Sequence, residues 1–148
     1  MKPKIILRIA SISMFLHTIG HTIGAMTWKK APDPAIQQVV DSMISQKFIF
    51  MGALRSIGDF YEGYGITMIF VLLLMAVLLW QLSTICIKYP GPAAGLLVPI
   101  SLSLLVIALI EFKYFFSLPG TLTVIAGLLS GWSVLIIRKN IAVGSVKS

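Results

Sequence analysis

Four long stretches of the chain contain no Asp, Glu, Lys or Arg and consist mostly of apolar residues. They cover residues 9–28, 63–87, 89–110 and 114–137, so each has at least 20 residues. Because lipid offers no hydrogen-bond partners to an open backbone, helices of roughly 20 apolar residues are the form in which a chain crosses a bilayer. The pattern predicts four transmembrane helices over about 6–28, 60–86, 91–112 and 119–138.

Two proline-containing segments predict where these helices are joined. Pro90-Gly91-Pro92 is a turn signal and is expected to end the second helix. Pro119-Gly120 is expected to form the turn between the third and fourth helices, which would then make a tight hairpin.

The connection between the first and second spans is too long for a plain turn. Asp33 followed by Pro34 is a typical helix start, with an N-cap acceptor and a proline at the first helical position. Apolar residues then recur at helical spacing as far as Ile44. An amphipathic helix is expected over about 34–51, on the outer interface or capping the bundle.

The predicted fold class is therefore all-α. We expect a four-transmembrane-helix bundle with an extra amphipathic helix between the first and second spans, in a single integral membrane domain over residues 1–148. The composition agrees, because 57% of the residues are hydrophobic and only 11% are charged, against about 25% in soluble domains.

The net charge of +7 predicts an orientation rather than a nucleic-acid partner. With four spans both termini share one side, which would carry seven basic residues and no acidic one. The opposite side would carry five basic and five acidic residues. Since basic loops stay in the cytoplasm, we expect an inner-membrane protein with both termini cytoplasmic. The seven residues are Lys2, Lys4, Arg8, Lys88, Arg138, Lys139 and Lys147.

Five ionisable residues are expected in the outer half of the bundle. They are His17, His21, Asp59, Glu62 and Glu111. The two histidines are one helical turn apart and therefore point the same way, as do Asp59 and Glu62. Ionisable groups inside a membrane are costly, so such residues indicate a functional site.

Three interpretations of these five residues stay open. The histidines could hydrogen-bond across helices as packing contacts, with the acids at the wet interface. His17 and His21, with one or two acids, could bind a transition metal such as Zn, Fe or Cu. Alternatively, histidine and acid could form a proton relay or a polar substrate pocket.

Small residues predict where helices approach closely. The first span contains Gly20-x-x-x-Gly24 and the fourth contains Gly127-x-x-x-Gly131. This spacing favours close helix packing, within one bundle or in a homo-oligomer.

Short motifs also carry a resemblance to a family. They are His17-Thr18-Ile19-Gly20-His21, Arg55-Ser56, Asp59-Phe60, Gly63-Tyr64-Gly65 and Tyr114-Phe115-Phe116-x-x-Pro119. The chain resembles a family of small uncharacterised bacterial four-helix membrane proteins, loosely similar to the DoxX-like proteins. The resemblance implies a fold and no activity, and it assigns no catalytic residue.

We therefore expect a small multi-pass membrane protein with an outward-facing polar pocket suited to binding, transport or an accessory role. The alternative is a membrane-embedded enzyme, an isomerase or oxidoreductase, that works with or without a metal. Its substrate would be a lipid-soluble small molecule. The lipid bilayer is the one partner that every interpretation shares.

Overall fold

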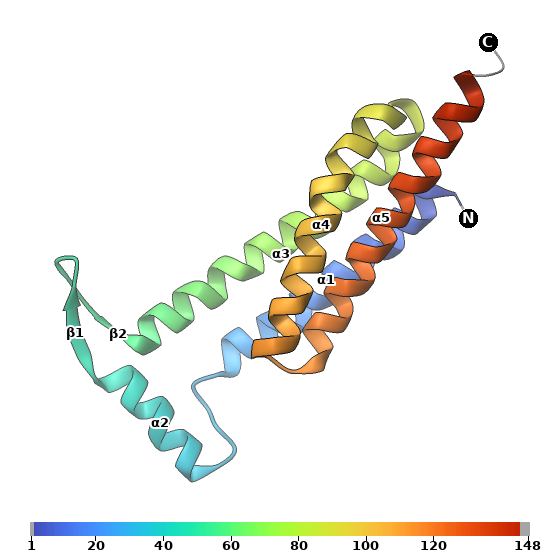
Figure 1. Ribbon diagram of the computed structural model, residues 1–148. Coiled ribbons are helices and arrows are strands. Elements are labelled where there is room, and N and C mark those ends of the chain that lie inside the picture. The colour runs from blue at the N-terminus through green and yellow to red at the C-terminus, as the bar shows by residue number, and fades with distance from the viewer. Residues whose placement is uncertain (1, 146–148) are drawn as a thin grey trace. The chain divides into compact units, whose positions relative to one another are not determined.

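The computed structural model describes residues 2–145, which form five helices and one two-stranded sheet (Figure 1). Four of the helices are long and apolar enough to cross a membrane. The predicted fold class is confirmed: the short helix lies between the first and second long ones. The elements are α1 (Pro3–Thr27), α2 (Pro34–Ser45), β1 (Lys47–Phe50), β2 (Ala53–Ser56), α3 (Ile57–Lys88), α4 (Pro90–Tyr114) and α5 (Ser117–Ser145).

Both proline segments lie in the first turn of a helix. Pro90 occupies the first position of α4, and Tyr89 alone separates it from α3, so the predicted end of the second helix is confirmed. The predicted turn at Pro119-Gly120 is wrong, because α4 ends at Tyr114 and both residues lie at the start of α5. Proline is tolerated in a first helical turn, since its missing N–H would have no partner there anyway.

Contacts divide the chain into two compact units, each of which contains part of α1 and part of α3. Met1–Thr18 and Leu72–Ser148 form one, here called the bundle unit, and Ile19–Val71 forms the other, here called the hairpin unit. Each is described by itself below. The prediction of one membrane domain over the whole chain stays a prediction.

In the bundle unit, serine side chains join helices to one another through backbone carbonyls. Ser11 Oγ donates to Ala76 O of α3 at 2.7 Å, and Ser101 Oγ of α4 donates to Gly127 O of α5 at 2.8 Å. Such hydroxyls bring helices close in an apolar medium. The N-terminal end of α1 and the C-terminal end of α5 lie at the same end of this unit (Figure 1).

In the hairpin unit, α2 begins as predicted. Asp33 Oδ1 accepts hydrogen bonds from Ala35 N at 2.7 Å and Ile36 N at 3.3 Å, and Pro34 is the first helical residue. However, α2 ends at Ser45, and the expected continuation of the helix to residue 51 is wrong.

A β-hairpin replaces the last part of that predicted helix. Strand β1 pairs antiparallel with β2, and Met51 and Gly52 form the turn with φ values of 48° and 83°. Positive φ at both turn residues suits a two-residue type I′ turn, and glycine adopts it without strain. The run Phe48-Ile49-Phe50 has high strand propensity, which explains why the helix does not continue.

Candidate intramembrane histidine–glutamate site

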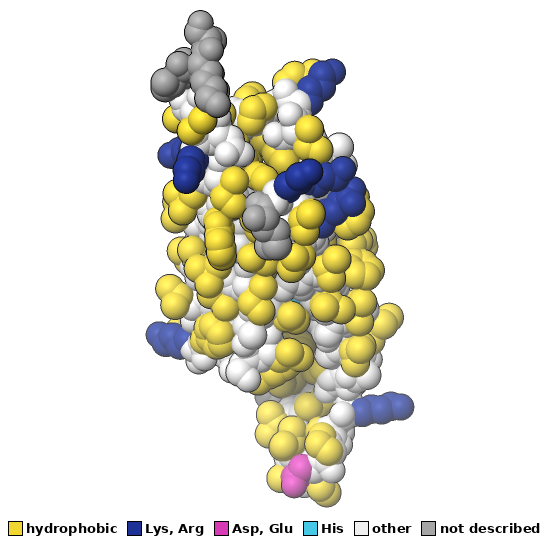
Figure 2. Space-filling view, turned by 90° about the vertical axis from the view of Figure 1, so that its right-hand side faces the viewer, with side chains coloured by type: hydrophobic (Ala, Val, Ile, Leu, Met, Phe, Trp, Pro, Cys, Tyr) yellow, Lys and Arg dark blue, Asp and Glu magenta, His cyan; other side chains and the backbone are white. Residues whose placement is uncertain are grey.

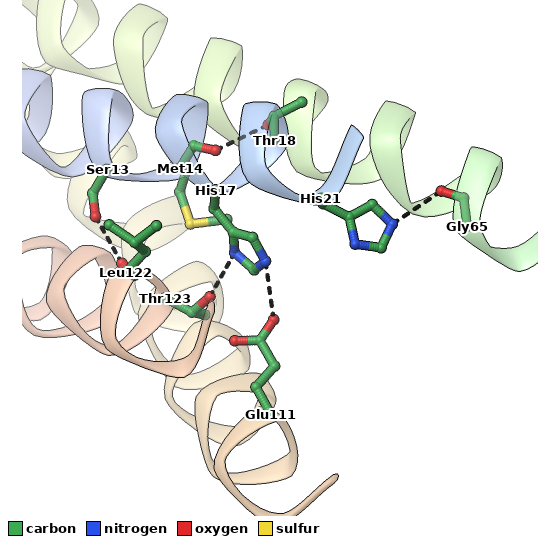
Figure 3. A network of polar contacts seen from close by, with 9 residues as sticks. All are labelled: Ser13, Met14, His17, Thr18, His21, Gly65, Glu111, Leu122 and Thr123. Carbon is green, nitrogen blue, oxygen red and sulfur yellow. Dashed lines mark hydrogen bonds and ion pairs between the residues drawn. The ribbon is translucent and has the colours of Figure 1, made fainter. Parts of the chain in front are cut away.

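His17 lies at the centre of a polar network in the bundle unit that joins α1, α4 and α5 (Figure 3). Its Nδ1 atom forms a hydrogen bond of 3.0 Å with Thr123 Oγ1 of α5. Its Nε2 atom lies 3.6 Å from Glu111 Oε1 of α4. The network thus brings two of the five predicted site residues together and adds a third residue, Thr123, that the sequence did not indicate.

The position of His17 follows from the face that α1 presents to α5. Ser13, one helical turn earlier, donates a hydrogen bond of 2.8 Å to the carbonyl of Leu122, the residue before Thr123. Residues four apart lie on the same helix face, so the serine contact and the histidine contact hold the two helices in one register. On the same helix, the Thr18 hydroxyl donates to Met14 O at 2.9 Å.

All three side chains of the network are buried. The exposed fraction is 5% for His17, 7% for Glu111 and 0% for Thr123. In such a low-dielectric environment, polar interactions are stronger than in water, and losing a partner is correspondingly expensive. An imidazole and a carboxyl group held this close form an acid–base pair that can take up, hold and release a proton.

His21 makes a different contact, inside the hairpin unit. Its Nε2 atom lies 3.0 Å from the carbonyl oxygen of Gly65 in α3. A carbonyl only accepts, so Nε2 carries the hydrogen and donates it. This contact joins the two helices within that unit (Figure 3), in the way expected of a packing histidine.

Asp59 and Glu62 also make contacts of their own in the hairpin unit. Asp59 Oδ2 accepts from Ser56 N at 2.8 Å, and Ser56 Oγ accepts from Asp59 N at 3.1 Å. This reciprocal pair is a capping box at the start of α3. Glu62 forms an exposed ion pair with Lys29, with Nζ 2.8 Å from Oε2.

A shallow hollow of about 210 Å³ runs along α3 in the hairpin unit. Its lining residues are Asp59, Phe60, Gly63, Tyr64 and Thr67. The hollow is open, and Asp59 is the one acid of the predicted pocket that lines it.

The structure adds no support to the metal interpretation. Within residues 2–145, no group of three or more His, Cys, Asp and Glu side chains is arranged to hold a metal ion. A transition-metal site at His17 and His21 therefore stays a prediction.

The two glycine pairs have different surroundings. A Cβ atom at Gly127 would lie 3.0 Å from Leu105 Cδ2 of α4, and one at Gly131 would lie 2.8 Å from Ser101 Oγ. At Gly20 and Gly24, a Cβ would meet no atom of the described chain within 4 Å. Close approach of α5 to α4 therefore depends on glycine, whereas the face of α1 at Gly20 has room for a side chain.

Comparison of the chain with protein-family models, curated proteins and solved structures finds no match. The resemblance to small bacterial four-helix proteins and DoxX-like proteins stays an expectation from the sequence motifs.

Proposed function

We propose that this multi-pass membrane protein is a non-enzymatic transport protein that moves protons, and that His17 and Glu111 exchange the proton. The single observation that carries the proposal is the buried contact of 3.6 Å between His17 Nε2 and Glu111 Oε1. Of the five predicted pocket residues, the proposal uses these two. His21, Asp59 and Glu62 are assigned to the structural contacts described above.

A proton is the ligand that suits this site best. Both side chains are more than nine-tenths buried, so a larger molecule would have to open the helices to reach them. Thr123 supports the exchange, because its hydroxyl can donate to Nδ1 in one imidazole tautomer and accept from it in the other. A change of tautomer lets the ring pass a proton between its two sides without leaving its place.

The orientation we propose is that of an inner-membrane protein with both termini in the cytoplasm. In support, Lys4 and Arg8 lie in the first two turns of α1, Arg138 and Lys139 lie towards the C-terminal end of α5, and Lys88 is the last residue of α3. Arg8 packs over the ring of Trp80 at 4.7 Å, an arrangement typical of the membrane interface. Lys147, also counted in the prediction, lies outside the described residues.

On the face that Figure 2 shows, hydrophobic side chains are spread widely over the surface. In the proposed orientation, alkaline phosphatase fused after Ser148 should be inactive, because that enzyme matures only outside the cytoplasm, and green fluorescent protein fused there should fluoresce. A fusion placed after Lys30 should give the reverse pattern. An active phosphatase after Ser148 would contradict both the orientation and the even number of crossings.

Proton flux into proteoliposomes tests the function. Vesicles containing a pH-sensitive dye, with potassium and valinomycin to balance charge, are exposed to an acid step outside. The wild-type protein should acidify the lumen faster than protein-free vesicles do. His17→Gln and Glu111→Gln should reduce the rate to that of protein-free vesicles, because glutamine cannot exchange a proton.

Two matched variants control for the substitutions themselves. His21→Gln and Glu62→Gln make the same chemical changes at residues assigned structural contacts, so both should keep the wild-type rate. Equal rates in wild-type and protein-free vesicles would contradict the proposal. It would also fail if His17→Gln and His21→Gln slowed the flux to the same extent.

A further inference from the structure

The β-hairpin in the hairpin unit has two faces that the pairing register separates. Phe48 pairs with Arg55 and Phe50 with Ala53 on one face, and Ile49 pairs with Leu54 on the other. Side chains alternate between faces along each strand. Both faces therefore carry apolar side chains, with Arg55 on the first face and Lys47 on the second.

One face of the hairpin is partly covered by the chain itself, with Phe48 38% and Phe50 49% exposed. The rings of Phe48 and Phe50 pack against Phe60 of α3, with centroid distances of 6.3 Å and 5.3 Å. Phe50, beside the turn, is the closer of the two. Since Phe60 is the fourth residue of α3, the hairpin lies beside the first turn of that helix rather than extending away from it.

On the other face, the residues near the turn are apolar and exposed, whereas Ser56 at its base is buried. The exposed fractions are 78% for Ile49, 57% for Leu54 and 92% for Met51 in the turn. An isolated two-stranded hairpin is at best marginally stable in water, so an exposed apolar face needs a cover.

The charge of Lys47 and the position of the hairpin near the charge-free part of α3 indicate what covers this face. Lys47 lies on the same face as Ile49, two residues nearer the base, and it is exposed. The charge-free part of α3 begins at Gly63, seven residues after Ser56 and therefore about 10 Å along the helix. An apolar tip with a lysine at its base, this close to a membrane-spanning segment, matches a lipid interface, with the ammonium group at the phosphates.

We propose that the hairpin is a membrane-interface anchor, in which Ile49, Met51 and Leu54 insert into the bilayer and Lys47 binds anionic phospholipid headgroups. The outer edges of the two strands carry backbone groups that the hairpin cannot pair. Those groups restrict the anchor to the headgroup region, where water and lipid esters satisfy them. This inference is independent of the proton site, which lies in the other unit.

Site-directed spin labelling tests the anchor in the full-length protein. Cys86, the one cysteine in the chain, is replaced in a Cys86→Ser background, and a nitroxide is attached through Ile49→Cys. In vesicles of mixed phosphatidylglycerol and phosphatidylcholine, the label should be more accessible to oxygen than to a water-soluble nickel chelate. A label at Gln38→Cys, an exposed polar position of α2, is the matched control and should show the opposite preference.

The lipid charge is tested in the same spin-labelled protein. Removing phosphatidylglycerol, or introducing Lys47→Gln, should raise the accessibility of the Ile49→Cys label to the nickel chelate relative to oxygen. Making both changes should raise it little further than either change alone. A label that prefers nickel in all vesicles would overturn the proposal. Dipolar broadening between labels, showing that a second copy covers the hairpin, would overturn it as well, and a depth independent of phosphatidylglycerol would overturn the assignment of Lys47.

Discussion

Replacing Glu111 with leucine is expected to lower the free energy of unfolding by about 1–3 kcal/mol, because a buried polar group loses its partner. The change removes one member of a buried polar pair and leaves His17, only 5% exposed, without the carboxylate that faces its Nε2 atom. Leucine is not smaller than glutamate, so a cavity does not account for the loss. Unfolding of the purified protein in detergent, followed by circular dichroism, measures the effect.

The double variant His17→Leu, Glu111→Leu separates stability from function. With both polar groups replaced by apolar ones, no buried polar group of the pair lacks its partner, so most of the lost stability should return. Proton flux should stay absent in this variant. If the two single losses simply add in the double variant, the side chains are not energetically coupled and the proposed pair is contradicted.

Gly127→Val is expected to cost about 1–3 kcal/mol by overpacking the contact between α4 and α5. The new Cβ would lie 3.0 Å from Leu105 Cδ2 and 3.3 Å from Leu104 Cβ, and valine adds two further carbons. The Gly127 carbonyl also accepts the hydrogen bond of Ser101, which a displaced α5 would lose. Thermal unfolding in detergent measures the change.

Gly20→Val is the matched control for this prediction. It makes the same substitution in a helix, at a position where a Cβ meets no described atom within 4 Å. Its effect should therefore be limited to the small helix-propensity difference between the two residues. A loss at Gly20 as large as that at Gly127 would contradict the packing described for α5.

The four spans could be predicted because their signal is simple: long apolar runs between charged residues. The hairpin could not be predicted. The apolar residues at helical spacing are followed closely by the apolar run Phe48-Ile49-Phe50, so the change from a helical to a strand pattern is hidden. Gly52 was the available signal, because Met51-Gly52 between two apolar runs is compatible with a hairpin turn. At Pro119-Gly120, the sequence indicated a turn, but a proline suits the start of a helix equally well.

The candidate site was predicted in part. His17 and Glu111 were both placed in the outer half of the bundle, but which acid faces which histidine depends on helix rotation, which the sequence does not supply. Thr123 was missed because one hydroxyl in an apolar helix carries no distinguishing pattern. The role of Asp59 could have been predicted, since Ser56 three residues earlier is the spacing of a capping box.

The most direct test of the account is whether Glu111 changes its protonation together with His17. Infrared difference spectra of the protein in a bilayer, recorded during a pH step, report the carboxylic-acid carbonyl and the imidazole ring separately. We predict a carboxyl band that disappears in Glu111→Gln and is altered in His17→Gln, while Glu62→Gln leaves it unchanged. Spectra of Glu111→Gln that match the wild type would contradict the account.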